Sequence, residues 1–151
     1  MMEQARHTNA ELTAHSSDGK PALPQLGLEA EYEREVPFEW TIAALNPKLP
    51  SVLSTPHMIG MMEGASARAV QLELPPGAIT VGTRIEVDHL KAVTVGAKVR
   101  AKAKLVEYRG RFLVFEVEAR SGEHLLGRGK VFRAIVEPAK HQAKADARKD
   151  A

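Results

Sequence analysis

Glu63 is a charged residue in a stretch of sequence that otherwise reads as helix core. It lies in the run STPHMIGMMEGAS, residues 54–66, in which almost every other residue is apolar or small. Burying an ionised carboxylate without a partner costs on the order of several kcal/mol, unless the group protonates. Glu63 therefore has two interpretations. It forms a structural pair with an arginine or lies at a cavity edge, or it is a catalytic or ligand-orienting carboxylate.

His89 is a second ionisable group on an apolar surface. Residues 79–89 alternate, and we expect one strand face to carry Ile79, Val81, Thr83, Ile85, Val87 and His89. That face should point at the helix that carries Glu63. A lone histidine there is more often a core residue than a catalyst, but two facing ionisable groups could meet in one pocket. Gly82 interrupts the same strand, which indicates either a simple bulge or a close approach by a ligand or another element.

Thr55 is the third candidate for chemistry. It precedes Pro56 and is expected to be an N-cap, with the proline at the first helical position. The free N–H groups of a helix N-terminus could also hold a developing oxyanion. Thr55 and Glu63 are eight residues apart, about 12 Å along a helix axis. One chain's pair can hardly reach the same small atom. We expect Thr55 to come from a second subunit, unless longer contacts or an extended ligand join the two.

A helix over about residues 55–72 must position Glu63. On a helical wheel, the residues within about 60° of Glu63 are Pro56, Ile59, Gly60, Ser66, Ala67 and Val70. Only a narrow wedge near His57, Arg68 and Gln71 is polar. We therefore expect the helix to be buried on nearly all sides, with Glu63 against protein rather than water.

Strands precede and follow this helix. The expected strands are residues 28–38, 79–89, 98–105, 113–119 and 125–136, and short turns join the last four. Short turns between alternating strands predict an antiparallel sheet. The fold class is therefore α+β, with a long central helix packed on a curled antiparallel sheet of about five strands.

The composition indicates an ordinary globular protein with one main domain. The chain has 151 residues, of which 44% are hydrophobic and 26% are charged. A net charge of +2 is too small to indicate nucleic-acid binding, and no apolar run reaches the ~18 residues of a membrane span. There is no cysteine, and residues 1–20 contain no apolar leader. We therefore expect a cytoplasmic protein that binds neither nucleic acid nor membrane.

The chain divides into three parts by composition. Residues 1–26 are polar and are expected to form a disordered or loosely packed arm. Residues 27–137 form the predicted folded domain. Residues 138–151 are a charged, Ala-rich tail without Leu, Ile, Val or Phe, expected to be a marginal helix or disordered.

Several spaced residues in the folded domain carry a family resemblance. They are Thr55, Met58, Gly60, Met62 and Glu63, then Val81, Gly82 and Thr83, then His89, Val95 and Gly96. This set resembles the hotdog-fold thioesterases of the fluoroacetyl-CoA thioesterase type over about residues 28–136. The Thr–Glu–His spacing distinguishes that family from other hotdog sequences. The resemblance implies a long helix wrapped by an antiparallel sheet, and a dimer with active sites at the subunit interface.

The resemblance also implies a role for each candidate residue. The family's catalytic threonine, glutamate and histidine fall on Thr55, Glu63 and His89, and the glycine of its acyl pocket falls on Gly82. Glu63 is then a nucleophile or a general base on water, and the sequence does not separate the two. His89 is a general acid or base, and Thr55 orients Glu63 or the water.

Two positions depart from the family pattern. Leu49 falls where the fluoroacetyl-specific enzyme has a phenylalanine that gates the pocket. Val131 falls where the last strand often has a histidine, within Gly127-Arg128-Gly129-Lys130-Val131-Phe132-Arg133. The expected substrate-binding residues are Gly82, Leu49 and Ile59. The departures concern substrate choice, so the resemblance implies a thioester substrate and leaves the acyl group open.

We therefore expect hydrolysis of a small acyl-CoA thioester to the free acid and coenzyme A, by a homodimer or dimer-based oligomer. The alternative is a non-catalytic hotdog protein that binds acyl-CoA or another small hydrophobic ligand. A hotdog hydratase is less favoured, because the helix lacks the Asp-x-x-x-x-His pattern. We expect no cofactor and no metal, since Glu63 and His89 supply only two ligands.

Basic residues could contact the phosphates of coenzyme A. Lys91, Lys98 and Arg100 are possible contacts. However, Lys98, Arg100, Lys102 and Lys104 alternate along one strand, and such a row is more often a solvated sheet face.

Overall fold

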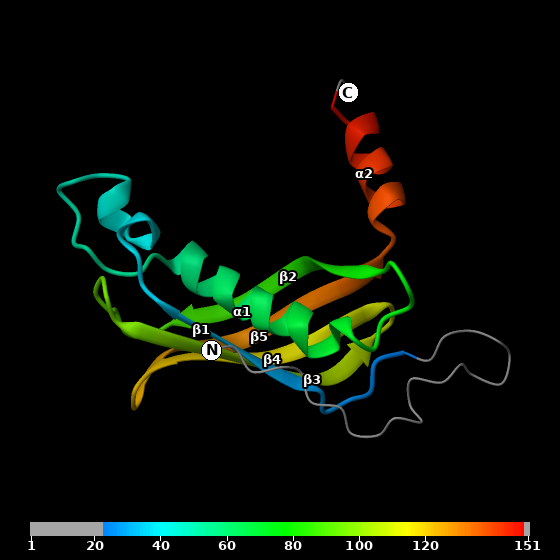
Figure 1. Ribbon diagram of the computed structural model, residues 1–151, viewed down its shortest axis with the longest axis horizontal. Helices are drawn as coiled ribbons and strands as arrows, with labels where there is room; N and C mark the ends of the chain where they lie inside the picture. The colour runs from blue at the N-terminus through cyan, green and yellow to red at the C-terminus, as the bar shows by residue number, and fades with distance from the viewer. Residues whose placement is uncertain (1–22, 150–151) are drawn as a thin grey trace, which may run out of the picture.

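The structure, a computed structural model, describes residues 23–149 and has one antiparallel sheet with a long helix against it (Figure 1). The elements are β1 (Glu29–Glu35), η2 (Phe38–Trp40), η3 (Ile42–Ala44), α1 (Thr55–Gln71), β2 (Ile79–His89), β3 (Lys98–Arg109), β4 (Phe112–Ser121), β5 (His124–Val136) and α2 (Pro138–Ala147). The strand order is β1-β3-β4-β5-β2, and every neighbouring pair is antiparallel. The predicted α+β arrangement, one long helix packed on five antiparallel strands, is confirmed.

The core lies between α1 and the sheet. In β3 the buried residues are Val99, Ala101, Ala103 and Leu105, and the residues between them are exposed. This period of two puts one face of the strand against the helix. The small alanines let the helix approach the sheet closely, and Met58, Met61 and Met62 of α1 are buried in the same core cluster. Their flexible thioether side chains suit the irregular space between a helix and a twisted sheet.

Ser54, rather than Thr55, caps the N-terminus of α1. Its backbone is extended, and its Oγ accepts a hydrogen bond of 3.3 Å from the backbone N–H of His57. Ser54 Oγ also lies 2.6 Å from His57 Nδ1, and the imidazole ring stacks on Trp40. The prediction that Thr55 is the N-cap is therefore wrong. Thr55 is the first helical residue, and its hydroxyl is not used in capping.

A bulge in β2 changes which side chains face α1. The pairing register of β2 with β5 shifts after Gly82, so Thr83 is an extra residue in the ladder. An extra residue moves all following side chains to the opposite face. Gly82 and His89, seven positions apart, therefore both face α1, while Ile79 faces away. The prediction that alternate residues from Ile79 to His89 share one face is wrong, because the bulge divides them.

Helix α1 is not covered on all sides within one chain. The sheet covers the methionine side of the helix, but Pro56 and Gly60 are exposed, and Ile59 and Glu63 are only half-buried. These four residues repeat every three or four positions and form one strip, called here the open strip. The prediction of burial nearly all round is therefore wrong for the single chain, because the sheet lies along one side of the helix.

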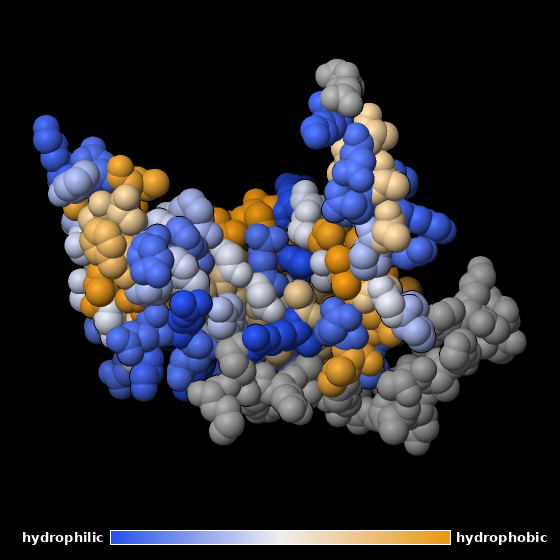
Figure 2. Space-filling view, turned by 45° about the horizontal axis from the view of Figure 1, so that its top comes forward, coloured by the Kyte–Doolittle hydropathy of each residue, from blue (hydrophilic) through white to orange (hydrophobic). Residues whose placement is uncertain are grey.

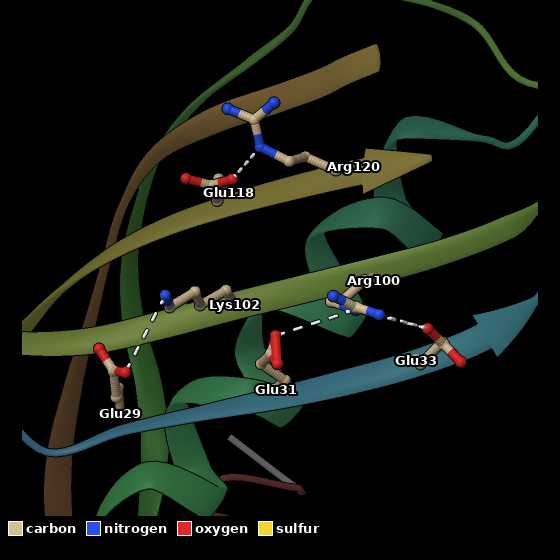
Figure 3. A network of polar contacts seen from close by, with 7 residues as sticks. All are labelled: Glu29, Glu31, Glu33, Arg100, Lys102, Glu118 and Arg120. Carbon is tan, nitrogen blue, oxygen red and sulfur yellow. Dashed lines mark hydrogen bonds and ion pairs between the residues drawn. The ribbon is translucent and has the colours of Figure 1, made fainter. Parts of the chain in front are cut away.

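The outer face of the sheet, away from α1, carries cross-strand charges (Figure 3). Arg100 lies 3.2 Å from Glu33 and 3.8 Å from Glu31, and Lys102 lies 4.0 Å from Glu29. One row alternates acid and base across all five strands, and its members are Glu31, Lys102, Glu118, Arg128 and Asp88. Opposed opposite charges stabilise neighbouring strands. These pairs favour the solvated-face interpretation of the basic row over a role for Arg100 in coenzyme A binding.

The described ends of the chain differ in how they are held. Tyr108 donates a hydrogen bond of 2.6 Å to the carbonyl of Pro24, and burial raises the pKa of Tyr108 to about 12. Residues 1–22 of the predicted arm lie outside the described residues. The predicted tail contains the helix α2, which has no buried side chain. Within residues 23–149, no helix has both the length and the apolar character to cross a membrane.

Gly127 lies where β5, β2 and α1 meet closely. A Cβ at this position would lie 2.6 Å from Met58 Cε and 2.8 Å from the backbone oxygen of Asp88. We expect Gly127→Ala to lower the free energy of unfolding by about 1–3 kcal/mol, because the strand backbone cannot move aside. Urea unfolding followed by circular dichroism measures this change. Glu123→Ala, in the exposed β4–β5 turn, is the control and should stay within about 0.5 kcal/mol. Equal losses in the two variants would contradict the packing argument.

Candidate active site

The carboxylate of Glu63 lies directly against the backbone of Gly82. An ideal Cβ built on Gly82 would lie only 2.1 Å from Glu63 Oε2, so any larger residue would displace the carboxylate. Gly82 thus combines both features that the sequence allowed, a bulge and a close approach. The Glu63 side chain is 36% exposed and belongs to the open strip. The carboxylate is therefore held by the sheet but still accessible within one chain.

Arg133 on β5 holds the carboxylate from the sheet side. Its Nη1 lies 3.2 Å from Glu63 Oε2, and its Nε and Nη2 donate hydrogen bonds of 2.8 Å to Oγ1 and the carbonyl oxygen of Thr80. The Arg133 side chain is only 9% exposed. Burial lowers the pKa of its guanidinium, and the charge and hydrogen bond of Glu63 oppose that shift. The arginine pair that the sequence allowed for Glu63 is therefore present.

Sequence reasoning did not identify Arg133 as part of the site. The signal was an arginine among apolar residues, between Phe132 and Ala134 in the last strand. A charged residue at an inward position of a core strand needs a partner. Glu63 on the core helix was the matching anomaly, but the pairing of the two depends on the strand register.

Thr55 and His89 form a second pair. Thr55 Oγ1 lies 2.7 Å from His89 Nδ1, which joins the start of α1 to the end of β2. The other ring nitrogen, Nε2, is buried and has no hydrogen-bond partner among residues 23–149. Leaving a buried polar atom unpaired costs about 1–3 kcal/mol. Such a cost is expected where a substrate or a second chain supplies the missing partner.

The two pairs are separate within one chain. Thr55 and Glu63 lie about 12 Å apart along the axis of α1, and Gly82 and His89 are separated by roughly 20 Å of strand. Helix α1 and strand β2 run in opposite directions. Thr55 and His89 therefore meet where α1 begins and β2 ends, and Glu63 and Gly82 meet further along the helix and nearer the start of the strand. The expectation that Glu63 and His89 converge in one pocket is therefore wrong for the single chain.

The other predicted residues take different positions. Ile59 precedes Glu63 by one helical turn on the open strip. Leu49 lies in the exposed segment between η3 and α1, and 41% of it is exposed. Val131 is fully buried in the core, so β5 offers no ionisable group at that position.

The chemistry available here is that of a carboxylate and an imidazole. Glu63 can attack a carbonyl or accept a proton, and the free Nε2 of His89 can donate or accept one. Within the described range, no three side chains of His, Asp or Glu are grouped to hold a metal ion.

Comparison with known proteins identifies a family. The profile of the fluoroacetyl-CoA-specific thioesterases matches residues 36–139. The fluoroacetyl-CoA thioesterase of Streptantibioticus cattleyicolor is 33% identical over 126 residues, which cover 80% of this chain and 91% of that protein.

Solved structures agree with this assignment. A fluoroacetyl-CoA thioesterase structure, 32% identical, matches with a TM-score of 0.77 and covers 83% of this chain and 97% of its own. A thioesterase superfamily member from Thermus thermophilus is 29% identical, with a TM-score of 0.75 over 83% of this chain and 93% of that one. A hot-dog-like protein from Thermanaerovibrio acidaminovorans, 20% identical with a TM-score of 0.73, shares the fold over 82% and 92% of the two chains. This chain therefore belongs to the fluoroacetyl-CoA-specific thioesterase family and is a thioesterase with the hotdog fold.

Proposed function

We propose that this protein hydrolyses a small acyl-CoA thioester to the free acid and coenzyme A, using Thr55, Glu63 and His89. The observation that carries the proposal is the Glu63 carboxylate, fixed by Arg133 and Gly82 yet accessible on the open strip. A structural ion pair alone has no need of an accessible carboxylate beside a glycine. The family membership supports the same reaction class.

Glu63 acts on the thioester carbonyl as a nucleophile or through an activated water. Arg133 donates a hydrogen bond to Oε2, so Oε1 is the oxygen that attacks the carbonyl or accepts the proton of water. Ile59, one helical turn before Glu63, and Gly82, against the carboxylate, flank the acyl group. Leu49, which is exposed between η3 and α1, borders the acyl group on the side of the helix N-terminus.

His89 supplies the proton that the leaving thiolate needs. Thr55 Oγ1 occupies Nδ1 and holds the ring, so Nε2 is the atom that transfers the proton. Through this contact Thr55 acts as a positioning residue. Its hydroxyl is available for this role because Ser54, and not Thr55, caps the helix. A ring held on one side and unpaired on the other is suited to proton transfer.

A second copy of the chain brings the two pairs together in this proposal. β2 is an edge strand of 11 residues, so one side of its backbone has no ladder partner among residues 23–149. The open strip lies beside that edge. Pairing β2 with β2 of a second copy would continue the sheet and cover the strip. The resulting homodimer has two sites, each built from both chains.

The proposed register of this pairing uses the bulge in β2. With a two-fold axis at Glu86, Ile85 lies opposite Val87 of the partner subunit, and both face the helices. Because Thr83 is an extra residue, Gly82 then lies opposite His89 of the partner subunit. On the outer face Arg84 lies opposite Asp88 of the partner subunit. These two pairs of opposite charges flank the two Glu86 carboxylates, which face each other at the axis and oppose the pairing. This register places Glu63 beside the imidazole of the other chain.

Glu63→Gln tests the catalytic proposal. The amide is nearly the same size and can still accept a hydrogen bond from Arg133, but it lacks the charge and basicity of the carboxylate. We expect kcat for small acyl-CoA thioesters to fall by ~10²-fold or more. Release of free thiol from a panel of short acyl-CoAs measures this rate.

Glu123→Gln, in the exposed β4–β5 turn, is the matched control and should keep the rate of the unaltered protein. Near-full activity of the Glu63→Gln variant would remove Glu63 from the mechanism. Acyl-CoA binding by the unaltered protein without any thiol release would favour a binding protein.

Glu86→Cys tests the dimer register. The chain has no cysteine, so the new thiol can form a disulfide only with the same position of a second copy of the chain. At the two-fold axis the two Cα atoms would lie about 4.5–5.5 Å apart, within disulfide range. We expect a covalent dimer on mild oxidation, visible by non-reducing electrophoresis.

Ile85→Cys is the control for this register, because its two copies would lie roughly 7–8 Å apart and should link poorly. Linking through position 85 but not 86 would show a different register. A protein that sediments as a monomer would contradict the shared site.

A further inference from the structure

The helix α2 and the β3–β4 turn enclose a basic hollow of about 410 Å³. Arg111 of the turn and Lys140, His141 and Lys144 of α2 line it. α2 stands clear of the body, with hydrophilic residues along it and hydrophobic surface at its base (Figure 2). Lys140 and Lys144 are four residues apart, so they project from the same side of the helix. Three permanent positive charges and one histidine therefore converge on one space.

The hollow has more basic than acidic side chains, whereas acids and bases alternate on the outer face of the sheet. Glu137 is the one acidic residue among those that line it, and it lies 3.5 Å from Lys140. Neither Arg111 nor Lys144 has a carboxylate within ion-pair distance among residues 23–149. On the outer face, by contrast, the register sets acid opposite base. The hollow therefore has a surplus of positive charge in a concave place, which suits an anion.

The hollow also lies on the strand that holds the proposed site. Its floor is Ile135 and Val136 at the end of β5, the strand that carries Arg133. From Arg133 to Val136 is about 10 Å of strand, and Lys144 lies about another 10 Å along α2. A neighbouring hollow, lined by Pro75, Pro76 and Ala78, shares the same two floor residues. These lengths add to about 20 Å, so a linear ligand anchored at Glu63 would have to extend about that far to reach the lysines.

We infer that the basic hollow binds the phosphates of the 3′-phosphoadenosine diphosphate part of coenzyme A. The inference rests on the proposed hydrolysis of acyl-CoA, whose pantetheine arm separates the thioester from these phosphates. Lysine and arginine are the side chains that bind phosphate through charged hydrogen bonds. The family profile ends at residue 139, so most of α2 is a feature of this chain beyond the family match. Lys91, Lys98 and Arg100 are not the main contacts in this assignment.

The double variant Lys140→Gln, Lys144→Gln tests the site by direct binding. Both side chains are exposed, so the fold should be unaffected. Calorimetry with adenosine 3′,5′-bisphosphate, coenzyme A and dephospho-coenzyme A measures Kd at low salt. We expect the Kd for coenzyme A to rise at least about ten-fold in the variant. Raising the salt concentration should reduce this difference.

Lys98→Gln, Lys104→Gln removes the same charge from the outer sheet face and is the matched control. A Kd that rises equally in this control, or stays unchanged in the α2 variant, would overturn the assignment. Failure of the unaltered protein to bind any of the three nucleotides would also overturn it. Equal binding of inorganic phosphate and coenzyme A would show a general anion site instead.

Kinetics separate this inference from the proposed function. The α2 variant should raise KM for acyl-CoA and leave kcat unchanged, because the contact is the same in the ground and transition states. KM for an acyl-pantetheine thioester, which lacks the nucleotide, should not change. If thioesters are not hydrolysed but nucleotide binding still depends on Lys140 and Lys144, the proposed function fails and the binding site stands.

Discussion

The ion pair between Arg133 and Glu63 is the interaction on which the site depends. A guanidinium buried in a sheet must have all its donors satisfied, and Thr80 and Glu63 provide the acceptors. Removing the Glu63 carboxylate would leave the buried Arg133 charge without its ionic partner, which is destabilising. The rotation of α1 on the sheet is therefore constrained. Gly82 completes the arrangement by leaving the space that the carboxylate fills.

The bulge at Thr83 is the second constraint, because it decides what the end of β2 presents to the helix. Without the extra residue, Gly82 and His89 would point to opposite faces of the sheet. The carboxylate would then meet the glycine, but the imidazole would face solvent on the charged outer side. One inserted residue thus allows two functional side chains on a single strand to face the same helix.

In the part of the chain that the structure describes, three features near one another lack a partner. The β2 edge lacks ladder partners, the open strip exposes Ile59 and Pro56, and His89 Nε2 is buried without a hydrogen bond. Each costs free energy in isolation. One partner strand laid along β2 would meet all of them. This is the physical reason to regard the single chain as half of a site.

The sequence by itself determined the elements and the unusual residues. Helix α1 and the strands follow from apolar periodicity and turn residues, and Thr55, Glu63, Gly82 and His89 were visible as residues out of keeping with their surroundings. The tertiary structure alone decided that Glu63 pairs with Arg133, that Ser54 caps the helix, and that Thr55 meets His89. Those contacts join segments far apart in the chain. They depend on strand register and on the direction of the helix across the sheet, which are set by packing rather than by local periodicity.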